Sequence, residues 1–352
     1  MGSNPTPCIF RTEIFWEIFS LAATLTSIMV VRRSFLNLSG ARKASFDGNI
    51  GFIGVGNMGS HMAMNLLKGH KSNKTGQKVF VFDKYPNEKI MTSLKQAGAI
   101  VSKGIEIDMI TDCDVFVTMV PSSAHVTEVY KTSILPGLRS HAKKGALLID
   151  CSTIDPNVSR EVSALAAADD HIMIDAPVSG GIKGAENGTL TFMVGTSLSE
   201  NDFNSTVRPF FSPMGKALYC GGPGVGQSVK VCNNLILGIQ MMGVAEGYRL
   251  AENLGVDLHK FNQIVNSSTG RCWTTEKYNP VPGLMSDVPA SREYKGGFMT
   301  DLMIKDLGLA LSASEPSDCP LPMTTFVKSE YKKISDSGKG ALDFGCCYQM
   351  YK

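Results

Sequence analysis

The alternation of short apolar runs with helical stretches constrains the fold of this chain more than any other feature. The apolar runs between residues 49 and 179 are NIGFIGVG, KVFVFD, DVFVTMV, GALLIDCST and HIMIDAPVS. Helical patterns such as NMGSHMAMNLLKG and PNVSREVSALAAA lie between them. Strands that alternate with helices predict a parallel sheet that is covered on both faces. We therefore expect a doubly wound α/β domain in the first half of the chain.

The second half reads as helical. After Cys220 the strand signals fade, and residues 225–255 keep helical periodicity with few charges and no proline. This stretch is apolar almost all round, so we expect it to be buried between domains or between subunits. Further helices are expected over residues 258–268, 300–315 and 323–338.

Length and composition favour a two-domain soluble enzyme. A chain of 352 residues is long enough for two separate cores. The net charge is only +2 and there is no long basic block, so nucleic acid is not an expected partner. The nine cysteines form no C-x-x-C pair, which favours free thiols in a reducing compartment. The six histidines form no H-E-x-x-H motif, and we expect no metal site.

The first 46 residues form an extension that does not belong to the fold. Residues 14–31 form an apolar stretch interrupted by a single acid, Glu17, and its length is near the lower limit for spanning a bilayer. From Met29 the sequence MVVRRSFLNLSGARKAS has four basic residues, three serines and no acid. That composition is typical of a mitochondrial presequence. The alternatives are a membrane anchor or secretory signal, and a disordered tail that carries no targeting signal. We expect a location in the mitochondrial matrix and no stable association with a membrane.

A glycine-rich turn follows the first predicted strand. Gly54-Val55-Gly56-Asn57-Met58-Gly59 has the pattern G-x-G-x-x-G and opens the first predicted helix. In such a turn the first glycine permits a tight bend, the second lets a pyrophosphate approach, and the third allows close helix packing. At this junction the pattern predicts dinucleotide binding rather than a purely structural turn.

Asp83 ends the second predicted strand, where a carboxylate would bind the adenosine ribose hydroxyls and repel a 2′-phosphate. NAD is therefore expected in preference to NADP, although the neighbouring Lys84 leaves some tolerance for NADP. Asp83 lies 29 residues after Gly54, and a long loop over residues 70–77 accounts for the distance. The alternative is that Asp83 only caps a turn.

Three groups of residues have the chemistry to oxidise an alcohol, which needs a base for the hydroxyl proton and a means of holding the substrate. The first is Ser179-Gly180-Gly181, which leaves a strand end and offers amides for a carboxylate. The second is Lys230 with Asn233 and Asn234, which share one helix face. Burial would lower the pKa of Lys230 and suit it to proton transfer. The third is Lys305-Asp306. A structural loop, a surface lysine and a solvated helix face are the respective alternatives.

Together these segments resemble the β-hydroxyacid dehydrogenase family. GFIGVGNMGSHMAMNL is similar to the family's cofactor signature, and DAPVSGGIKGAENGTLTFMVG to its substrate-binding signature. GVGQSVKVCNN resembles its catalytic-lysine motif, and IKDLGLA its late lysine–aspartate motif. The resemblance covers residues 49–348. The segment GRCWTTEKYNPVPGLMSDVPASREYKGGF resembles the branch that oxidises 3-hydroxyisobutyrate, rather than those that reduce tartronate or succinic semialdehyde.

The resemblance implies NAD-dependent oxidation of 3-hydroxyisobutyrate to methylmalonate semialdehyde, a step of valine breakdown. It implies that Lys230 is the general acid and base and that Asn234 orients the substrate hydroxyl. Ser179, Gly180 and Gly181 would hold the carboxylate, and Lys305 would lie near substrate and nicotinamide. Cofactor contacts are also implied for residues after the later strands: Val120, Pro121, His125 and Thr153.

The expected domain organisation follows from both halves. Residues 47–222 would form the Rossmann-like dinucleotide-binding domain and residues 223–352 a helical domain for substrate binding and oligomerisation, joined by the long helix. We expect a homodimer or homotetramer that pairs through the helical domain. A dehydrogenase for another small β-hydroxyacid, a non-catalytic relative that binds the cofactor, and a membrane-tethered scaffold are the rival hypotheses. The C-terminal DFGCCYQMYK departs from the family pattern and leaves details of closure open.

Overall fold

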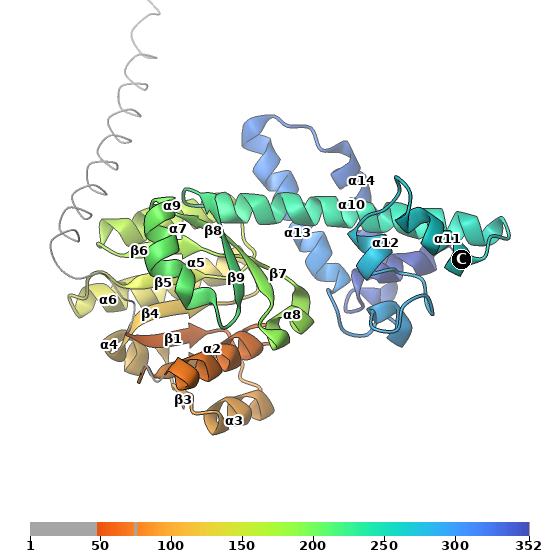
Figure 1. Cartoon of the computed structure of the whole chain (residues 1–352). Helices are drawn as coiled ribbons and strands as arrows, with labels where there is room; N and C mark the ends of the chain where they lie inside the picture. Colours follow the sequence, from red (N-terminus) through yellow and green to blue (C-terminus); the bar gives the residue numbers. More distant parts are fainter. Residues whose placement is uncertain (1–47, 74–75, 352) are drawn as a thin grey trace, which may run out of the picture.

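The protein consists of a sheet-based domain and a helical domain joined by one long helix (Figure 1). The computed structural model describes residues 48–73 and 76–351, and the predicted presequence lies outside these residues. Within the described ranges no helix has the length and apolarity needed to cross a membrane. The same ranges contain no cluster of side chains suited to a metal ion. All eight cysteines between residues 76 and 351 are free thiols.

Nine strands form one sheet in the first domain. The sheet order is β3-β2-β1-β4-β5-β6-β8-β7, with β9 also paired to β8. The strands are β1 (Asn49–Ile53), β2 (Val79–Phe82), β3 (Ile100–Val101), β4 (Cys113–Thr118), β5 (Leu147–Asp150), β6 (Ile172–Asp175), β7 (Val178–Ser179), β8 (Leu190–Thr196) and β9 (Gly215–Gly221). The first six strands are parallel, so their carboxyl ends lie along one edge of the sheet.

The sheet is mixed rather than purely parallel, which corrects one expectation. β8 runs antiparallel to β6 and to β7, while β9 runs parallel to β8. The reversal follows from the connection: only α8 (Gly181–Asn187) separates β7 from β8, and a parallel crossover needs a dozen or more residues.

Helices cover both faces of the sheet and produce two cores. Phe52 and Val117 pack on one face beneath α2 (Gly59–Asn73) and α3 (Glu88–Gln96). Neighbouring strand residues point the other way: Phe116 and Leu148 pack beneath α6 (Leu135–Ser140) and α7 (Pro156–Ala168). Because both faces are buried, the strands need apolar residues at consecutive positions, and this is why they read as uninterrupted apolar runs. The shorter helices of the domain are α4 (Ile110–Asp112), α5 (Ser123–Glu128) and α9 (Glu200–Asp202).

The loop expected over residues 70–77 is shorter in the structure, because helix α2 extends into it. The helix continues to Asn73, so the first part of residues 70–77 is helical.

The helical domain surrounds the far end of α10 (Val225–Asn253). Its core gathers Met241, Tyr248 and Leu307 with the C-terminal Phe344. The remaining helices are α11 (Leu258–Asn266), α12 (Trp273–Lys277), α13 (Thr300–Ser314) and α14 (Pro322–Ile334).

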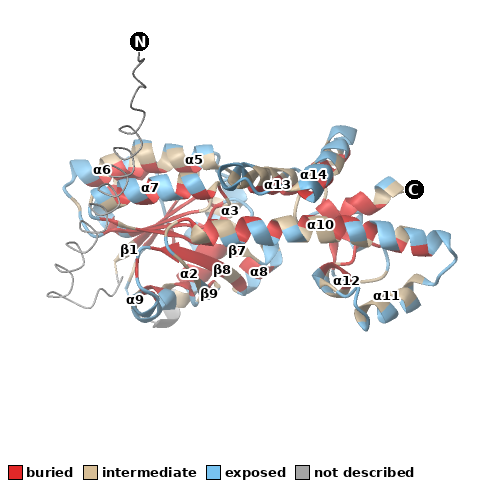
Figure 2. Cartoon of the chain, turned by 90° about the horizontal axis from the view of Figure 1, so that it is seen from above, coloured by how far each residue is buried: buried red, intermediate tan, exposed pale blue. Residues whose placement is uncertain are grey.

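The long helix α10 is not buried all round within one chain. Figure 2 shows exposed stretches along it between the domains. Val229, Ile236 and Leu250 are 40%, 54% and 60% exposed. Contacts within one chain therefore cover only part of its apolar surface. The expectation that α10 is buried between the two domains is met only in part, and burial between subunits stays a prediction.

Candidate active site

The glycine-rich turn between β1 and α2 has the geometry of a pyrophosphate cradle. A side chain at Gly54 would meet the carbonyl oxygen of Met119 at 2.3 Å, and one at Gly59 would meet that of Gly54 at 1.9 Å. A side chain at Gly56 would meet nothing within 4 Å. The first and third glycines are thus required by packing inside the protein, whereas the second leaves open space at the helix start. The free N–H groups of a helix N-terminus favour an anion there, so the turn fits a dinucleotide.

Asp83 lies directly after β2 and braces this turn. Its carboxylate accepts hydrogen bonds from the backbone N–H of Val55 at 2.9 Å and of Tyr85 at 2.8 Å. The turn-capping alternative is therefore part of what Asp83 does. Each carboxylate oxygen has a second lone pair, so these bonds are compatible with ribose binding. The neighbouring Lys84 is paired with Glu128 at 2.7 Å.

The other expected cofactor residues follow the carboxyl ends of β4 and β5. The Val120 N–H donates to Ser152 Oγ at 2.9 Å, which ties the two loops together. His125 is exposed on α5, and its Nδ1 lies 2.8 Å from Ser122 Oγ. Pro121 and Thr153 are brought together by a third residue from the helical domain: Lys305 donates to their carbonyl oxygens at 3.3 Å and 2.9 Å.

A buried chain of polar side chains lies between α10 and α13. Lys230 Nζ donates to Asn234 Oδ1 at 3.0 Å, and Asn234 Nδ2 donates to Asp306 Oδ2 at 2.6 Å. All three residues are buried, with 8%, 2% and 2% of their surface exposed. Asn233, which shares the helix face in the sequence pattern, is exposed and donates to Asn234 Oδ1 at 3.0 Å. Asn234 is therefore part of the buried chain, whereas Asn233 lies at the edge of the site.

Burial lowers the pKa of Lys230 from 10.5 to about 8. Loss of hydration disfavours the ammonium form, the nearby Asp306 carboxylate partly restores it, and the positive charge of Lys305 opposes it again. An amine with this pKa is populated in both protonation states near neutral pH, which general acid–base catalysis requires.

Asp306 connects the buried chain to the cofactor side. Its second oxygen, Oδ1, lies 3.2 Å from Lys305 Nζ, an ion pair without the alignment of a hydrogen bond. Lys305 in turn reaches the carbonyl of Thr153. Lys305 and Asp306, adjacent on α13, thus contact the loop after β5 on one side and Asn234 on the other.

The loop expected to hold a carboxylate follows β7. Ser179 ends that strand, Gly180 precedes α8 and Gly181 is the first residue of α8. β7 pairs with β8, and α10 packs against β8, so this loop and the lysine helix share one supporting strand. An ion pair of 3.1 Å between Lys183 of α8 and Asp287 joins the loop to the segment after α12.

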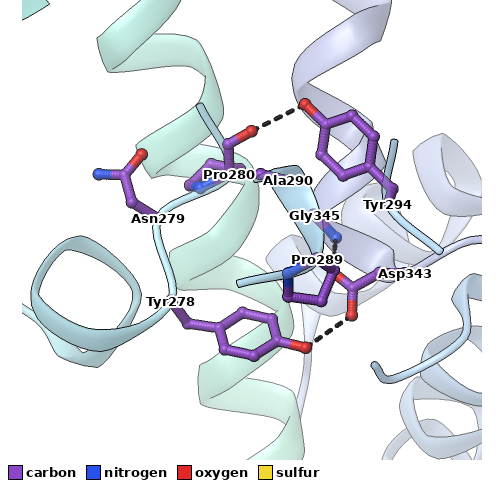
Figure 3. Close-up of a pocket in the computed structure, with 8 residues that line it drawn as sticks. All are labelled: Tyr278, Asn279, Pro280, Pro289, Ala290, Tyr294, Asp343 and Gly345. Atoms are coloured by element: carbon purple, nitrogen blue, oxygen red, sulfur yellow. Dashed lines mark hydrogen bonds between the residues drawn. The ribbon is translucent and has the colours of Figure 1, made fainter. Parts of the chain in front are cut away.

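That segment, residues 278–297, is closed against the C-terminus (Figure 3). Tyr278 Oη donates to Asp343 Oδ2 at 2.8 Å, and Tyr294 Oη donates to the Pro280 carbonyl at 2.8 Å. The space between these side chains holds no room for a water molecule. Burial raises the pKa of Asp343 to about 6, against three hydrogen bonds that favour its charged form. These hydrogen bonds hold the segment against the C-terminal residues.

Three buried residues in or beside the site were not predicted as functional. In the sequence Asp306 stands out as the neighbour of Lys305, and Gln227 and Asp175 lie inside longer motifs without a predicted role of their own. Asp175 accepts hydrogen bonds from the backbone N–H of Gly224 at 2.7 Å and Gln227 at 2.9 Å. For Gln227 and Asp175 the signal available in the sequence is a polar residue within an otherwise apolar helix or strand, which is costly to bury without a partner.

These features define a class of protein. A sheet with a dinucleotide cradle, beside a buried lysine of lowered pKa that is hydrogen-bonded to an amide, is the arrangement of a nicotinamide-dependent dehydrogenase.

Comparisons with known proteins agree with this class. Residues 49–222 match the family described as the NAD-binding domain of 6-phosphogluconate dehydrogenase. Residues 224–351 match the family described as NAD-binding of NADP-dependent 3-hydroxyisobutyrate dehydrogenase.

Individual relatives are similar over most of their length. A probable mitochondrial 3-hydroxyisobutyrate dehydrogenase of Dictyostelium discoideum is 44% identical over 86% of this chain and 90% of its own. The mitochondrial 3-hydroxyisobutyrate dehydrogenase of Rattus norvegicus is 41% identical over 86% of this chain and 87% of its own. The solved structure of the Mycobacterium tuberculosis 3-hydroxyisobutyrate dehydrogenase with L-serine has a TM-score of 0.77 at 35% identity, covering 87% of this chain and 99% of that one.

The chain belongs to the 3-hydroxyisobutyrate dehydrogenase family, and its first domain is an NAD-binding domain. The expected fold is confirmed: a Rossmann-like domain is followed by a helical domain. The mitochondrial names of the relatives place the chain in the mitochondrion with them.

Proposed function

We propose that this protein oxidises 3-hydroxyisobutyrate to methylmalonate semialdehyde with NAD, as a step of valine breakdown in the mitochondrial matrix. The observation that carries the proposal is the buried chain Lys230–Asn234–Asp306, beside a cofactor cradle and in a member of this family.

In the proposed reaction Lys230 is the general base. In its neutral form it accepts the proton of the substrate hydroxyl at Nζ, and in the reverse reaction it returns that proton. A pKa of about 8 means that neither protonation state is rare at the pH of the compartment. The bound nicotinamide supplies the acceptor for the hydride that leaves the hydroxyl-bearing carbon.

Asn234 is proposed to orient the substrate hydroxyl toward Lys230. Its Oδ1 already accepts from Lys230 and its Nδ2 already donates to Asp306, so the amide is held in one orientation. The loop Ser179-Gly180-Gly181 is proposed to bind the substrate carboxylate through its hydroxyl and backbone N–H groups. Such neutral donors fit a carboxylate without the cost of burying another cation.

The turn Gly54-Val55-Gly56-Asn57-Met58-Gly59 and Asp83 are proposed to bind the pyrophosphate and ribose of NAD. The pairing of Lys84 with Glu128 supports NAD over NADP, because the cation next to Asp83 in the chain is already bound to a carboxylate. The loop residues Val120, Pro121, His125 and Thr153 are proposed to line the rest of the cofactor, with Lys305 between cofactor and substrate.

We also propose that the domains divide between residues 222 and 223 and that the protein is a homodimer or homotetramer. Several apolar side chains of the helical domain are exposed in the single chain, including Leu254 at 71%, Ile264 at 61% and Phe326 at 55%. Pairing of subunits through this domain would cover such side chains.

The second candidate is oxidation of another small β-hydroxyacid. It is supported by the solved relative with L-serine, whose hydroxyl is on the β carbon of a small acid. The test is NADH formation by the purified protein with each enantiomer of 3-hydroxyisobutyrate, with L-serine and with NADP in place of NAD. Turnover of one enantiomer that is lost in Lys230→Ala would support the proposal. Turnover of L-serine alone would favour the second candidate, and tight NADH binding without any turnover would refute oxidation of 3-hydroxyisobutyrate and of L-serine.

A further inference from the structure

Gln227 lies three residues before Lys230 on α10 and has no surface exposed. Its side-chain amide bonds to two backbone groups of the loop after β5. Nε2 donates to the Ser152 carbonyl at 2.7 Å, and Oε1 accepts from the Ile154 N–H at 3.1 Å. The two bonds enclose Thr153, whose own carbonyl accepts from Lys305. An apolar side chain would fill the same space but would leave a buried donor and a buried acceptor without partners.

A second contact, made by a residue of β6, fixes the start of α10. The Asp175 carboxylate accepts from the N–H groups of Gly224 and Gln227, so it caps the helix from a neighbouring strand. This position at the positive end of the helix dipole stabilises the carboxylate. A side chain at Gly226 would come within 2.2 Å of the Met193 carbonyl oxygen of β8, which shows how closely the helix start approaches the sheet.

These contacts close a ring around the site. From Gln227 the ring passes through the Ser152–Ile154 loop to the Thr153 carbonyl and Lys305, and then through Asp306 to Asn234. It returns to Lys230 and along one turn of α10 to Gln227. Two steps of the ring join the domains, namely the bonds of Gln227 to the Ser152–Ile154 loop and that of Lys305 to the Thr153 carbonyl. The Asn234–Asp306 bond joins the two helices of the site, while the Lys305–Asp306 ion pair lies within α13 and the Lys230–Asn234 bond within α10.

We infer that Gln227 is a positioning residue for the reaction: it holds Lys230 and the cofactor-side loop at Thr153 in a fixed relation. Gln227 touches neither reacting group in this account and acts through the loop on one side and the helix on the other. Small misplacements of reacting groups lower rates by about 10- to 100-fold. This inference rests on the proposed function for its activity readout, and NADH binding gives a readout that does not.

The test compares Gln227→Met, Gln227→Glu and a matched control. Methionine keeps the length and removes both bonds. A glutamic acid in its neutral form can restore both, because its O–H donates to the Ser152 carbonyl and its carbonyl accepts from the Ile154 N–H. The ionised form has no donor and faces that carbonyl with a negative charge. The control is His171→Leu, which removes a buried side-chain bond to the Ala146 N–H at the opposite, amino end of β5 and β6.

We expect Gln227→Met to lose about 10- to 100-fold in kcat/KM and to bind NADH several-fold more weakly, while His171→Leu changes stability but neither quantity. The ratio of Gln227→Glu activity to wild-type activity should fall as pH rises, and dividing by the wild type removes the titration of Lys230. Burial places this transition above the ordinary carboxyl pKa of about 4.3.

Wild-type activity and NADH affinity in Gln227→Met would overturn the inference. So would a Gln227→Glu variant that is no better than Gln227→Met at any pH, or equal losses in His171→Leu. If the wild type binds NADH but does not oxidise the substrate, the proposed function fails, and the NADH affinities of the same three variants still decide the role of Gln227.

Discussion

Replacing Lys230 by methionine should make the protein more stable at neutral pH, although it removes the proposed catalytic base. In the folded chain burial lowers the pKa of this lysine from 10.5 to about 8. One pKa unit corresponds to about 1.4 kcal/mol, so holding the ammonium in the fold costs about 3 kcal/mol at neutral pH. The hydrogen bond to Asn234 that methionine removes is worth about 1 kcal/mol in the opposite direction.

The sign of the pH dependence follows from linkage. Between pH 8 and 10.5 the unfolded chain holds the lysine proton and the folded chain releases it, so the wild type gains stability as pH rises. Below about pH 8 both states are protonated and the full penalty is present. Methionine has no such transition. The stability difference between Lys230→Met and wild type should therefore shrink by roughly three quarters of the penalty between about pH 7 and about pH 10.

The assay is urea unfolding followed by circular dichroism at several pH values, with Lys183→Met as the control. Lys183 is an exposed lysine with 67% of its side chain accessible, so its loss reports the general effect of removing one positive charge. A stability difference for Lys230→Met that is constant with pH, or that grows as pH rises, would show that Lys230 is not held at a lowered pKa by burial.

Three further predictions concern the reaction and the cofactor. The kcat/KM for oxidation should rise with pH through about 8 and that for reduction should fall, because the proposed base and acid are the neutral and protonated forms of Lys230. Profiles of kcat/KM against pH in both directions check this, and profiles that change in the same direction would contradict it. Asp83→Ala should weaken the preference for NAD over NADP by about tenfold or more, since it removes a negative charge that would repel a 2′-phosphate. The ratio of kcat/KM values for the two cofactors measures this preference, and an unchanged ratio would leave Asp83 with only its hydrogen bonds to the Val55 and Tyr85 N–H groups. Gly59→Ala should abolish NADH binding or destabilise the protein by about 1–3 kcal/mol, because the new Cβ would lie 1.9 Å from the Gly54 carbonyl oxygen. The Cβ added by Gly56→Ala meets no protein atom within 4 Å, so this variant should bind NADH more weakly without loss of stability.

Elements with a clear local signal could be predicted from the sequence. The five apolar runs are strands, and the long helical stretch is α10, because their periodicity follows from which faces are buried. The direction of β8 could not be predicted, because it depends on how a short connection brings the chain back to the sheet. The sequence also does not indicate which apolar residues of α10, such as Ile236, are exposed in the folded chain.

The candidate site divides in the same way. Lys230 and Asn234 are four residues apart, and helical spacing alone places them on one face. Asp306 lies 72 residues further along the chain, and only the packing of α13 on α10 brings it to Asn234. The contact of Gln227 with the Ser152–Ile154 loop likewise spans more than 70 residues.

Local sequence patterns indicate five of the strand runs, the long helix α10, the glycine-rich turn and the lysine–asparagine pair, because each depends on residues close together in the chain. Tertiary structure decided which of the polar residues are joined to that pair, and it decided the protonation of Lys230. A pKa is set by burial and by charges from distant segments, and neither exists until the two domains have packed around α10.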